Sequence, residues 1–353
     1  MDTLRSLKLP DLQHLTTNMH LPRQYTKPLA TIGSLWATYQ LYRLANFTYY
    51  HFLRPYNLQK YKDGLGPPWA LVTGASDGIG LGFAEELASQ GFNVILHGRN
   101  ETKLQTVSSK LQTQFPNRKF KILVLDAIET AGDSPKLQTA LSEFKDLNLK
   151  ILVNNVGGPA GPKPSFKPFS QQEPANIDAW IDMNLRFPTQ LTRQALPSLI
   201  ESQPALILNI SSGAANVPSP FIAVYSGSKA FNVSWSRSLA VELEDAGHDV
   251  DCHAIVVGPT ATERTMKAGF SPGLTQPTSR RMARASLGFA GTAKRDVAAY
   301  WGHGVLMAVF AVLPGWYAEK FVRDISRGVV RAEEKEMEEE EEKAKQEQGQ
   351  KQS

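Results

Sequence analysis

The chain has one cysteine among its 353 residues, so it cannot form an internal disulfide bond. Cys252 lies in the apolar run CHAIVV, which is typical of a small core residue in a reducing environment. The sequence contains no group of cysteines and histidines with the spacing of a zinc site, and we therefore expect no metal.

Acidic residues are missing from one segment and concentrated in another. Residues 28–53 contain no Asp or Glu, whereas residues 331–353 hold nine Glu against five Lys or Arg. The acidic block 338–342 repels itself and predicts a solvated helix or a disordered tail. The net charge is +4, but the positive charges are scattered and no binding motif interleaves them with aromatics, so we expect no nucleic-acid partner.

The acid-free segment 28–53 is long enough to cross a bilayer, but it makes a poor span because it contains Gln40, Arg43, Asn46 and His51. Its apolar residues recur at helical spacing, which equally indicates a helix lying in the membrane interface. We predict membrane association and leave open whether the helix spans the membrane or lies flat. Basic residues flank the segment on both sides, so charge does not orient it.

From Trp69 to Val257, short runs rich in Val, Ile and Leu alternate with helix-length segments. Such nearly continuous apolar runs are typical of parallel strands buried on both faces; they read WALVTGA, NVILHG, KFKILVLDA, LKILVNNVG, PALILNISS and DVDCHAIVVG. The alternation predicts an α/β fold with a doubly wound parallel sheet of the Rossmann type, with an N-terminal membrane-associated helix and an apolar C-terminal extension.

Composition divides the chain into four predicted parts. They are an N-terminal segment (1–66), a catalytic domain (67–265), a substrate- or membrane-proximal extension (266–330) and an acidic tail (331–353). Within the extension, residues 297–318 carry no formal charge. This stretch is suited to covering the substrate pocket, docking on the N-terminal helix or dipping into lipid, and the sequence does not choose among these roles.

A glycine-rich turn joins the first predicted strand to a helix. Gly74, Gly78 and Gly80 follow the spacing GxxxGxG, which lets the backbone turn sharply and approach a pyrophosphate at the positive end of the helix. We predict dinucleotide binding here, with Ser76, Asp77 and Ile79 in the same turn as further cofactor-binding residues.

The second predicted strand ends in Gly98-Arg99, where an NAD site would be expected to present an acid to the ribose hydroxyls. A guanidinium is suited to pair with a 2′-phosphate instead. The sequence therefore predicts NADPH as the cofactor.

Four motifs, TGASDGIG, NNVG, NISS and YSGSK, occur in this order and resemble those of the short-chain dehydrogenases/reductases over roughly residues 67–262. The resemblance implies that Tyr225 is the proton donor in carbonyl reduction, or the base in alcohol oxidation, and that Lys229, one helical turn later, holds the nicotinamide ribose. A nearby ammonium favours the phenolate, so we expect Lys229 to lower the pKa of Tyr225.

The same resemblance assigns further roles. Ser212 would hydrogen-bond the substrate oxygen, with its neighbour Ser211 the less favoured choice because strand alternation points the two in opposite directions. Asn184 would support a proton-relay water beside the lysine. Asp126 and Asn154 would line the adenine and central parts of the cofactor pocket, and Thr262 would lie near the cofactor amide.

Within this family, the N-terminal segment, GPPWALVTGASDGIG and NNVG look like the very-long-chain 3-oxoacyl-CoA reductases of the endoplasmic reticulum and the related 17β-hydroxysteroid dehydrogenases. That likeness implies a reductase of a lipidic ketone, first a long-chain 3-oxoacyl-CoA and then a steroid or other isoprenoid ketone. It also implies a place at the endoplasmic reticulum membrane, with the catalytic domain facing the cytosol. A homodimer or a larger membrane enzyme assembly is the expected organisation.

Two stretches depart from the family pattern, VVGPTATERT after the last strand and the proline-rich loop GGPAGPKPSFKPFSQQEPANID. Because of these two departures, the identity of the substrate stays open. An alternative of another class is a membrane scaffold that binds NADPH without turnover, although such a protein has no need of the proton of a tyrosine.

Overall fold

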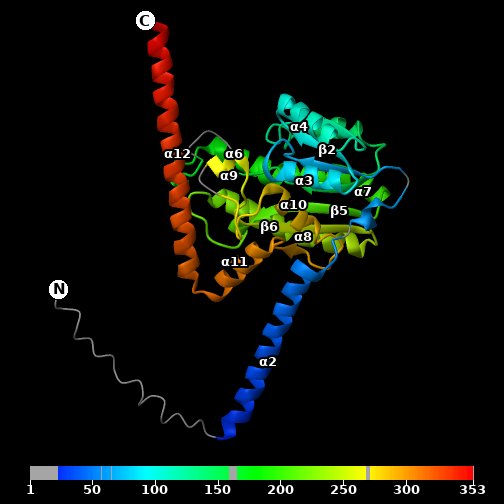
Figure 1. The fold of residues 1–353 in the computed structure, drawn as a ribbon, viewed down its shortest axis with the longest axis vertical. Coiled ribbons are helices and arrows are strands. Elements are labelled where there is room, and N and C mark those ends of the chain that lie inside the picture. Colours follow the sequence, from blue (N-terminus) through cyan, green and yellow to red (C-terminus); the bar gives the residue numbers. More distant parts are fainter. Residues whose placement is uncertain (1–22, 57, 65, 159–164, 268–270, 353) are drawn as a thin grey trace, which may run out of the picture. The chain divides into compact units, whose positions relative to one another are not determined.

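The computed structural model describes residues 23–352 except 57, 65, 159–164 and 268–270 (Figure 1). The chain divides into two compact units, Met1–Arg54 and Pro55–Ser353. The acidic-tail prediction allowed a helix, and the described residues 331–352 are helical.

The described part of the first unit is the helix α2 (Arg23–Thr48), continued by one π-helical turn, η1 (Tyr49–Leu53). Its large apolar side chains are exposed, with Leu35 67% and Trp36 65% accessible. No helix in the described ranges combines the length and the apolar character that crossing a membrane requires.

The second unit is built on a seven-stranded sheet in the order β3-β2-β1-β4-β5-β6-β7, and every neighbouring pair is parallel. The strands are β1 (Trp69–Thr73), β2 (Asn93–Gly98), β3 (Phe120–Val124), β4 (Leu149–Asn154), β5 (Ala205–Ser212), β6 (Val250–Val257) and β7 (Asp296–Val297). The predicted doubly wound parallel sheet is confirmed. The two-residue β7 is too short to leave a hydrophobic pattern in the sequence.

Helices lie between the strands and flank the sheet, and α11 and α12 follow the last strand (Figure 1). They are α3 (Gly78–Ser89), α4 (Glu101–Gln114), α5 (Ser134–Ser142), α6 (Pro174–Ile181), α7 (Phe187–Glu201), α8 (Ala223–Asp245), α9 (Glu263–Lys267), α10 (Ser279–Leu287), α11 (Trp301–Val312) and α12 (Gly315–Gln352). Side chains of α5, α7 and α8 share one apolar core with the strands. Burial of these side chains supplies the main driving force for folding.

Helix α10, from the C-terminal extension, packs closely on α3. A Cβ atom added at Gly82 of α3 would lie 2.5 Å from the carbonyl carbon of Ser279. Arg280 of α10 also donates from Nε to the buried carboxylate of Glu86 at 3.1 Å. The extension is therefore part of the second unit.

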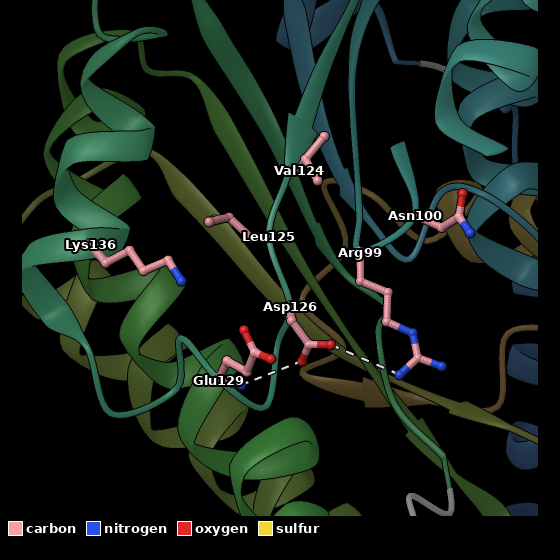
Figure 2. Close-up of a pocket in the computed structure, with 7 residues that line it drawn as sticks. All are labelled: Arg99, Asn100, Val124, Leu125, Asp126, Glu129 and Lys136. Atoms are coloured by element: carbon pink, nitrogen blue, oxygen red, sulfur yellow. Dashed lines mark hydrogen bonds and ion pairs between the residues drawn. The ribbon is translucent and has the colours of Figure 1, made fainter. Parts of the chain in front are cut away.

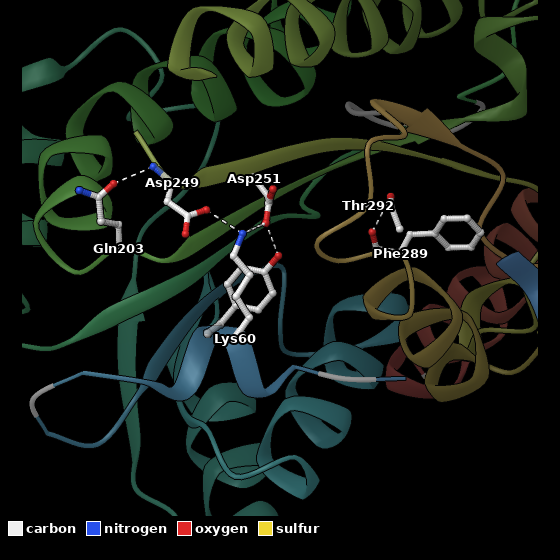
Figure 3. Close-up of polar contacts among 7 residues, drawn as sticks. Lys60, Gln203, Asp249, Asp251, Phe289 and Thr292 are labelled. Atoms are coloured by element: carbon white, nitrogen blue, oxygen red, sulfur yellow. Dashed lines mark hydrogen bonds and ion pairs between the residues drawn. The ribbon is translucent and has the colours of Figure 1, made fainter. Parts of the chain in front are cut away.

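A short 3₁₀ turn, η2 (Gln59–Lys62), ties the entry of the second unit to β6 (Figure 3). Lys60 Nζ lies 2.7 Å from a carboxylate oxygen of Asp249 and 2.9 Å from one of Asp251. The Tyr61 hydroxyl donates to the same oxygen of Asp251. These contacts fix the segment that leads into β1.

Candidate active site

The turn between β1 and α3 has the geometry of a phosphate cradle. Gly74 and Gly78 adopt φ values of +64° and +57°, a region that side chains other than glycine rarely occupy. A Cβ atom at Gly80 would overlap the Gly74 carbonyl oxygen and would lie 2.6 Å from Asn155 Nδ2. The N-cap Asp77 accepts from the Gly78 amide at 2.5 Å. Bare backbone at a helix N-terminus fits a dinucleotide pyrophosphate.

Asn155, which is not among the residues predicted from the sequence, supports this turn. Its Nδ2 donates to the Thr73 carbonyl at 2.9 Å, and it lies beside Gly74 and Gly80. The expected residue, Asn154, is 4% exposed, and its Nδ2 donates inward to Thr192 Oγ1 at 2.8 Å and to Asn209 Oδ1 at 2.7 Å. Because neighbouring residues at a strand end point in opposite directions, Asn154 faces the core and Asn155 faces the glycine turn.

Arg99 and Asp126 line an open pocket of about 490 Å³ at the ends of β2 and β3 (Figure 2). The Arg99 side chain is 76% exposed, and its NH1 lies 3.9 Å from Asp126 Oδ2. Asp126 Oδ1 accepts from the Ile128 amide at 2.8 Å, which holds the turn after β3. An exposed guanidinium over a pocket of this size is suited to a phosphate group. Ser76 lies nearby, its Oγ 3.6 Å from the Cβ position of Gly98.

Tyr225 and Lys229 lie on α8, and Ser212 ends β5. Lys229 Nζ lies 5.7 Å from the centroid of the Tyr225 ring and donates to the Ile210 carbonyl at 2.9 Å. Ser211 turns away to donate to the Lys229 carbonyl at 2.7 Å, as strand alternation predicts. The structure therefore brings Tyr225, Lys229 and Ser212 together.

The direction of the Tyr225 pKa differs from the sequence expectation. Burial raises the pKa of Tyr225, and a hydrogen bond with Ser212 opposes that shift. Burial also lowers the pKa of Lys229 to about 8. The expectation that Lys229 lowers the pKa of Tyr225 is wrong for this structure, because desolvation of the phenol outweighs the other influences.

Asn184 lies in a π-helical turn, η4 (Asp182–Arg186), where α6 passes into α7. Its side chain accepts from the Gly158 amide and donates to the Gly158 carbonyl, both at 2.9 Å. A Cβ atom at Gly157 would lie 2.7 Å from Asn184 Oδ1 and 2.9 Å from Lys229 Nζ, so both groups converge on this glycine. Single π turns inside helices are frequent at functional sites.

Thr262, which follows β6, lies across from the glycine turn. Its Cγ2 is 3.5 Å from the Cβ position of Gly78. The Thr262 amide donates to Thr265 Oγ1 at 2.8 Å, and Thr265 in turn donates to the Thr260 carbonyl at 2.7 Å. The loop after β6 is thus a compact hydrogen-bonded turn facing the predicted cofactor site.

A second open pocket, of about 420 Å³, lies beside the tyrosine helix. Its lining combines the segment before α8 and the first turn of α8 with side chains of α12: Pro218, Ser219, Pro220, Ala223, Ser226, Glu319 and Arg323. Glu333 of α12 further accepts from the Ser165 amide at 2.8 Å. Sequence analysis did not single out the α12 residues among them, because no motif identifies that helix.

Comparison with known proteins agrees with this arrangement. The sequence profile described as short chain dehydrogenase matches residues 68–271. A protein of Pyricularia oryzae named very-long-chain 3-oxoacyl-CoA reductase is 33% identical over 302 residues, which cover 84% of this chain and 88% of the relative. A Neurospora crassa protein of the same name is 32% identical, over 74% of this chain and 77% of its own.

A solved structure is also similar. The short-chain dehydrogenase of Sphingobium yanoikuyae, in complex with NADPH, is 26% identical with a TM-score of 0.56, covering 70% of this chain and 96% of that one. A 7β-hydroxysteroid dehydrogenase structure is 19% identical with a TM-score of 0.64, over 75% and 99% of the two chains, and shows the shared fold.

Proposed function

Because the chain belongs to the short-chain dehydrogenase family, we propose that it reduces the ketone of a long-chain 3-oxoacyl-CoA with NADPH. It is an oxidoreductase that uses a nicotinamide cofactor. The observation that carries the choice of substrate is the match over most of the chain to relatives named very-long-chain 3-oxoacyl-CoA reductase.

The active-site residues divide the work of carbonyl reduction. The nicotinamide supplies a hydride to the carbonyl carbon when it is bound. Tyr225 gives its phenolic proton to the carbonyl oxygen, and Ser212 donates a hydrogen bond to the same oxygen. Lys229 and Asn184 hold the ribose and a relay water beside the tyrosine. A phenol carries its proton at neutral pH, as a proton donor must, and burial raises the pKa of Tyr225 further.

The preference for NADPH rests on the charge at the end of β2. Arg99 is exposed there, and β2 ends in Gly98, where an acid would otherwise contact the ribose hydroxyls. Replacing Arg99 with Gln should lower the kcat/KM for NADPH more than the kcat/KM for NADH. A variant that leaves the ratio of the two kcat/KM values unchanged would contradict this preference.

We also propose that the protein works at the endoplasmic reticulum membrane with its catalytic unit in the cytosol. The supporting observation is α2, whose large apolar side chains are exposed from Tyr25 to Leu44, with Gln40 and Arg43 among them. A helix of this kind is suited to the membrane interface. Flotation of the full chain with vesicles, compared with a chain that begins at Pro55, tests this part separately.

The function is tested by NADPH oxidation with detergent-solubilised protein. A long-chain 3-oxoacyl-CoA and a 17-ketosteroid are offered in parallel, and Tyr225→Phe is the control. Removal of a general acid should lower kcat by roughly 10²- to 10⁴-fold. Turnover of the steroid alone would make the acyl-CoA proposal wrong. NADPH binding without turnover of either substrate would favour the alternative of a non-catalytic scaffold.

A further inference from the structure

A histidine of the C-terminal extension is buried against the loop that follows β6. His303, in the first turn of α11, is fully buried. Its ring lies so close to the backbone that a Cβ atom at Gly258 would be 2.6 Å from His303 Cδ2. The ring also meets Tyr300 edge to face, with the centroids 5.2 Å apart. The sequence offers no sign of this contact, because 45 residues separate His303 from Gly258.

Both ring nitrogens of His303 bind the backbone of the same loop. The Gly258 amide donates to Nδ1 at 3.0 Å, and Nε2 lies 3.0 Å from the Pro259 carbonyl oxygen. An amide can only donate, so Nδ1 must be the unprotonated nitrogen and Nε2 must carry the hydrogen. Burial lowers the pKa of His303, which favours this neutral form.

The loop that His303 holds is the one that faces the glycine turn. Thr260 Oγ1 donates to the Gly258 carbonyl at 3.1 Å, and the Thr260 carbonyl accepts from Thr265 at 2.7 Å. Thr265 accepts from the amide of Thr262, whose methyl group faces Gly78. A chain of hydrogen bonds therefore runs from His303 to the side of the predicted cofactor site.

The same face of α11 reaches the other half of the active site. Met307 lies one turn after His303, and its Cε is 3.6 Å from the Cβ position of Gly213, the residue after Ser212. Side chains four residues apart share one face of a helix. Helix α11 thus contacts the loops after both β5 and β6.

We propose that His303 is a positioning residue that holds the loop 258–262 in the conformation that binds the nicotinamide end of the cofactor. The inference rests on the proposed role of Thr262 in cofactor binding. Met307, on the same helix face, lies against Gly213, the residue after Ser212, and in this proposal serves as a wall of the substrate site. Because α11 contacts both loops, it fixes the distance between the loop after β5 and the loop after β6.

Three full-length variants test this inference. His303→Phe keeps an aromatic ring but loses both hydrogen bonds. His303→Asn places an acceptor close to the position of Nδ1 and so retains the bond from Gly258. Met307→Ala removes packing from the same face without changing a polar contact of the loop.

The first readout is hydrogen exchange of the Gly258, Thr260, Ala261 and Thr262 amides in the cofactor-free protein, and the second is the NADPH dissociation constant from fluorescence titration. Loss of the bonds to the loop should speed exchange in His303→Phe and raise the dissociation constant about tenfold. His303→Asn should stay within about threefold of the wild type. Met307→Ala should leave both readouts unchanged and raise the KM for the ketone.

Unchanged exchange in His303→Phe would overturn the inference, and so would faster exchange with an unchanged NADPH dissociation constant. An equal loss in His303→Asn and His303→Phe would also overturn it, because burial alone would then explain the residue. Failure of the acyl-CoA to react, with exchange and NADPH binding as expected, would instead refute only the proposed substrate.

Discussion

The glycine turn after β1 and the C-terminal extension both line the active site, but they are held in different ways. In the turn, Gly74 and Gly80 approach each other through backbone atoms only six residues apart in the chain. In the extension, His303 binds a loop 45 residues away, and in the acidic tail Glu333 binds amides 168 and 167 residues away. Local geometry leaves a motif in the sequence, whereas long-range packing does not.

Two buried histidines sharpen the comparison. His97 of β2 stacks on Phe187 at 5.1 Å, and neither of its ring nitrogens has a hydrogen-bond partner in the described structure. His303 uses both of its ring nitrogens to bind backbone atoms. His97 therefore fills apolar space, and its protonation would destabilise the fold, whereas His303 holds two backbone groups through hydrogen bonds.

The largest expected effect is on the glycine turn. Gly80→Ala places a methyl group on the Gly74 carbonyl and close to Asn155. The turn must shift to accommodate it, so we expect NADPH affinity to fall about 100-fold or more, roughly 3 kcal/mol, in a fluorescence titration. Gly328→Ala is the matched control, because nothing lies within 4 Å of its Cβ position. Equal NADPH affinities in the two variants would contradict the prediction that this turn binds the cofactor phosphates.

The next prediction concerns the pH dependence of stability. Burial lowers the pKa of His97 to about 4, whereas an unfolded histidine titrates near 6.5. The unfolded state then binds more protons between these values, so the unfolding free energy falls as pH drops from about 6.5 to 4, by at most about 3 kcal/mol. In urea titrations, His97→Leu should lose that part of the acid sensitivity. Identical pH profiles would show that His97 is not the group responsible.

A smaller effect is expected where the extension meets the loop after β6. Gly258→Ala forces a Cβ atom within 2.6 Å of the buried His303 ring. Overpacking of this kind typically costs about 1–3 kcal/mol of unfolding free energy. Urea denaturation compares it with Gly328→Ala, which should be neutral or slightly stabilising because alanine favours the helix. An unchanged unfolding free energy in Gly258→Ala would mean that α11 shifts at little cost to accommodate the added methyl group.

The smallest expected effect lies on α12. Glu333 is 9% exposed and accepts from the amides of Ser165 and Phe166 at 2.8 and 3.2 Å. Glu333→Gln keeps an acceptor but loses the charge, so we expect a loss of about 1 kcal/mol in denaturation. Glu334→Gln, at an exposed position of the same helix, should change nothing measurable. A larger effect at Glu334 would contradict this account of α12.

Several site residues were predicted from the sequence because their spacing follows the geometry of one element. Tyr225 and Lys229 lie one turn apart on α8, and the glycine turn opens α3 as the motif indicated. The choice between Asn154 and Asn155 was missed, because it depends on which face of the sheet a strand end presents. The direction of the Tyr225 pKa was missed because spacing says nothing about desolvation.

The sequence by itself determined the parallel sheet, the phosphate turn and the tyrosine–lysine pair, because each depends on apolar runs or on residues within one turn of chain. Only the tertiary structure decided that α11 holds the loop after β6 through His303 and that α12 lines a pocket beside Ser226. Those contacts join segments that are distant along the chain. They form because burial of apolar helix faces brings those segments together. No local sequence pattern specifies the position at which such a helix packs.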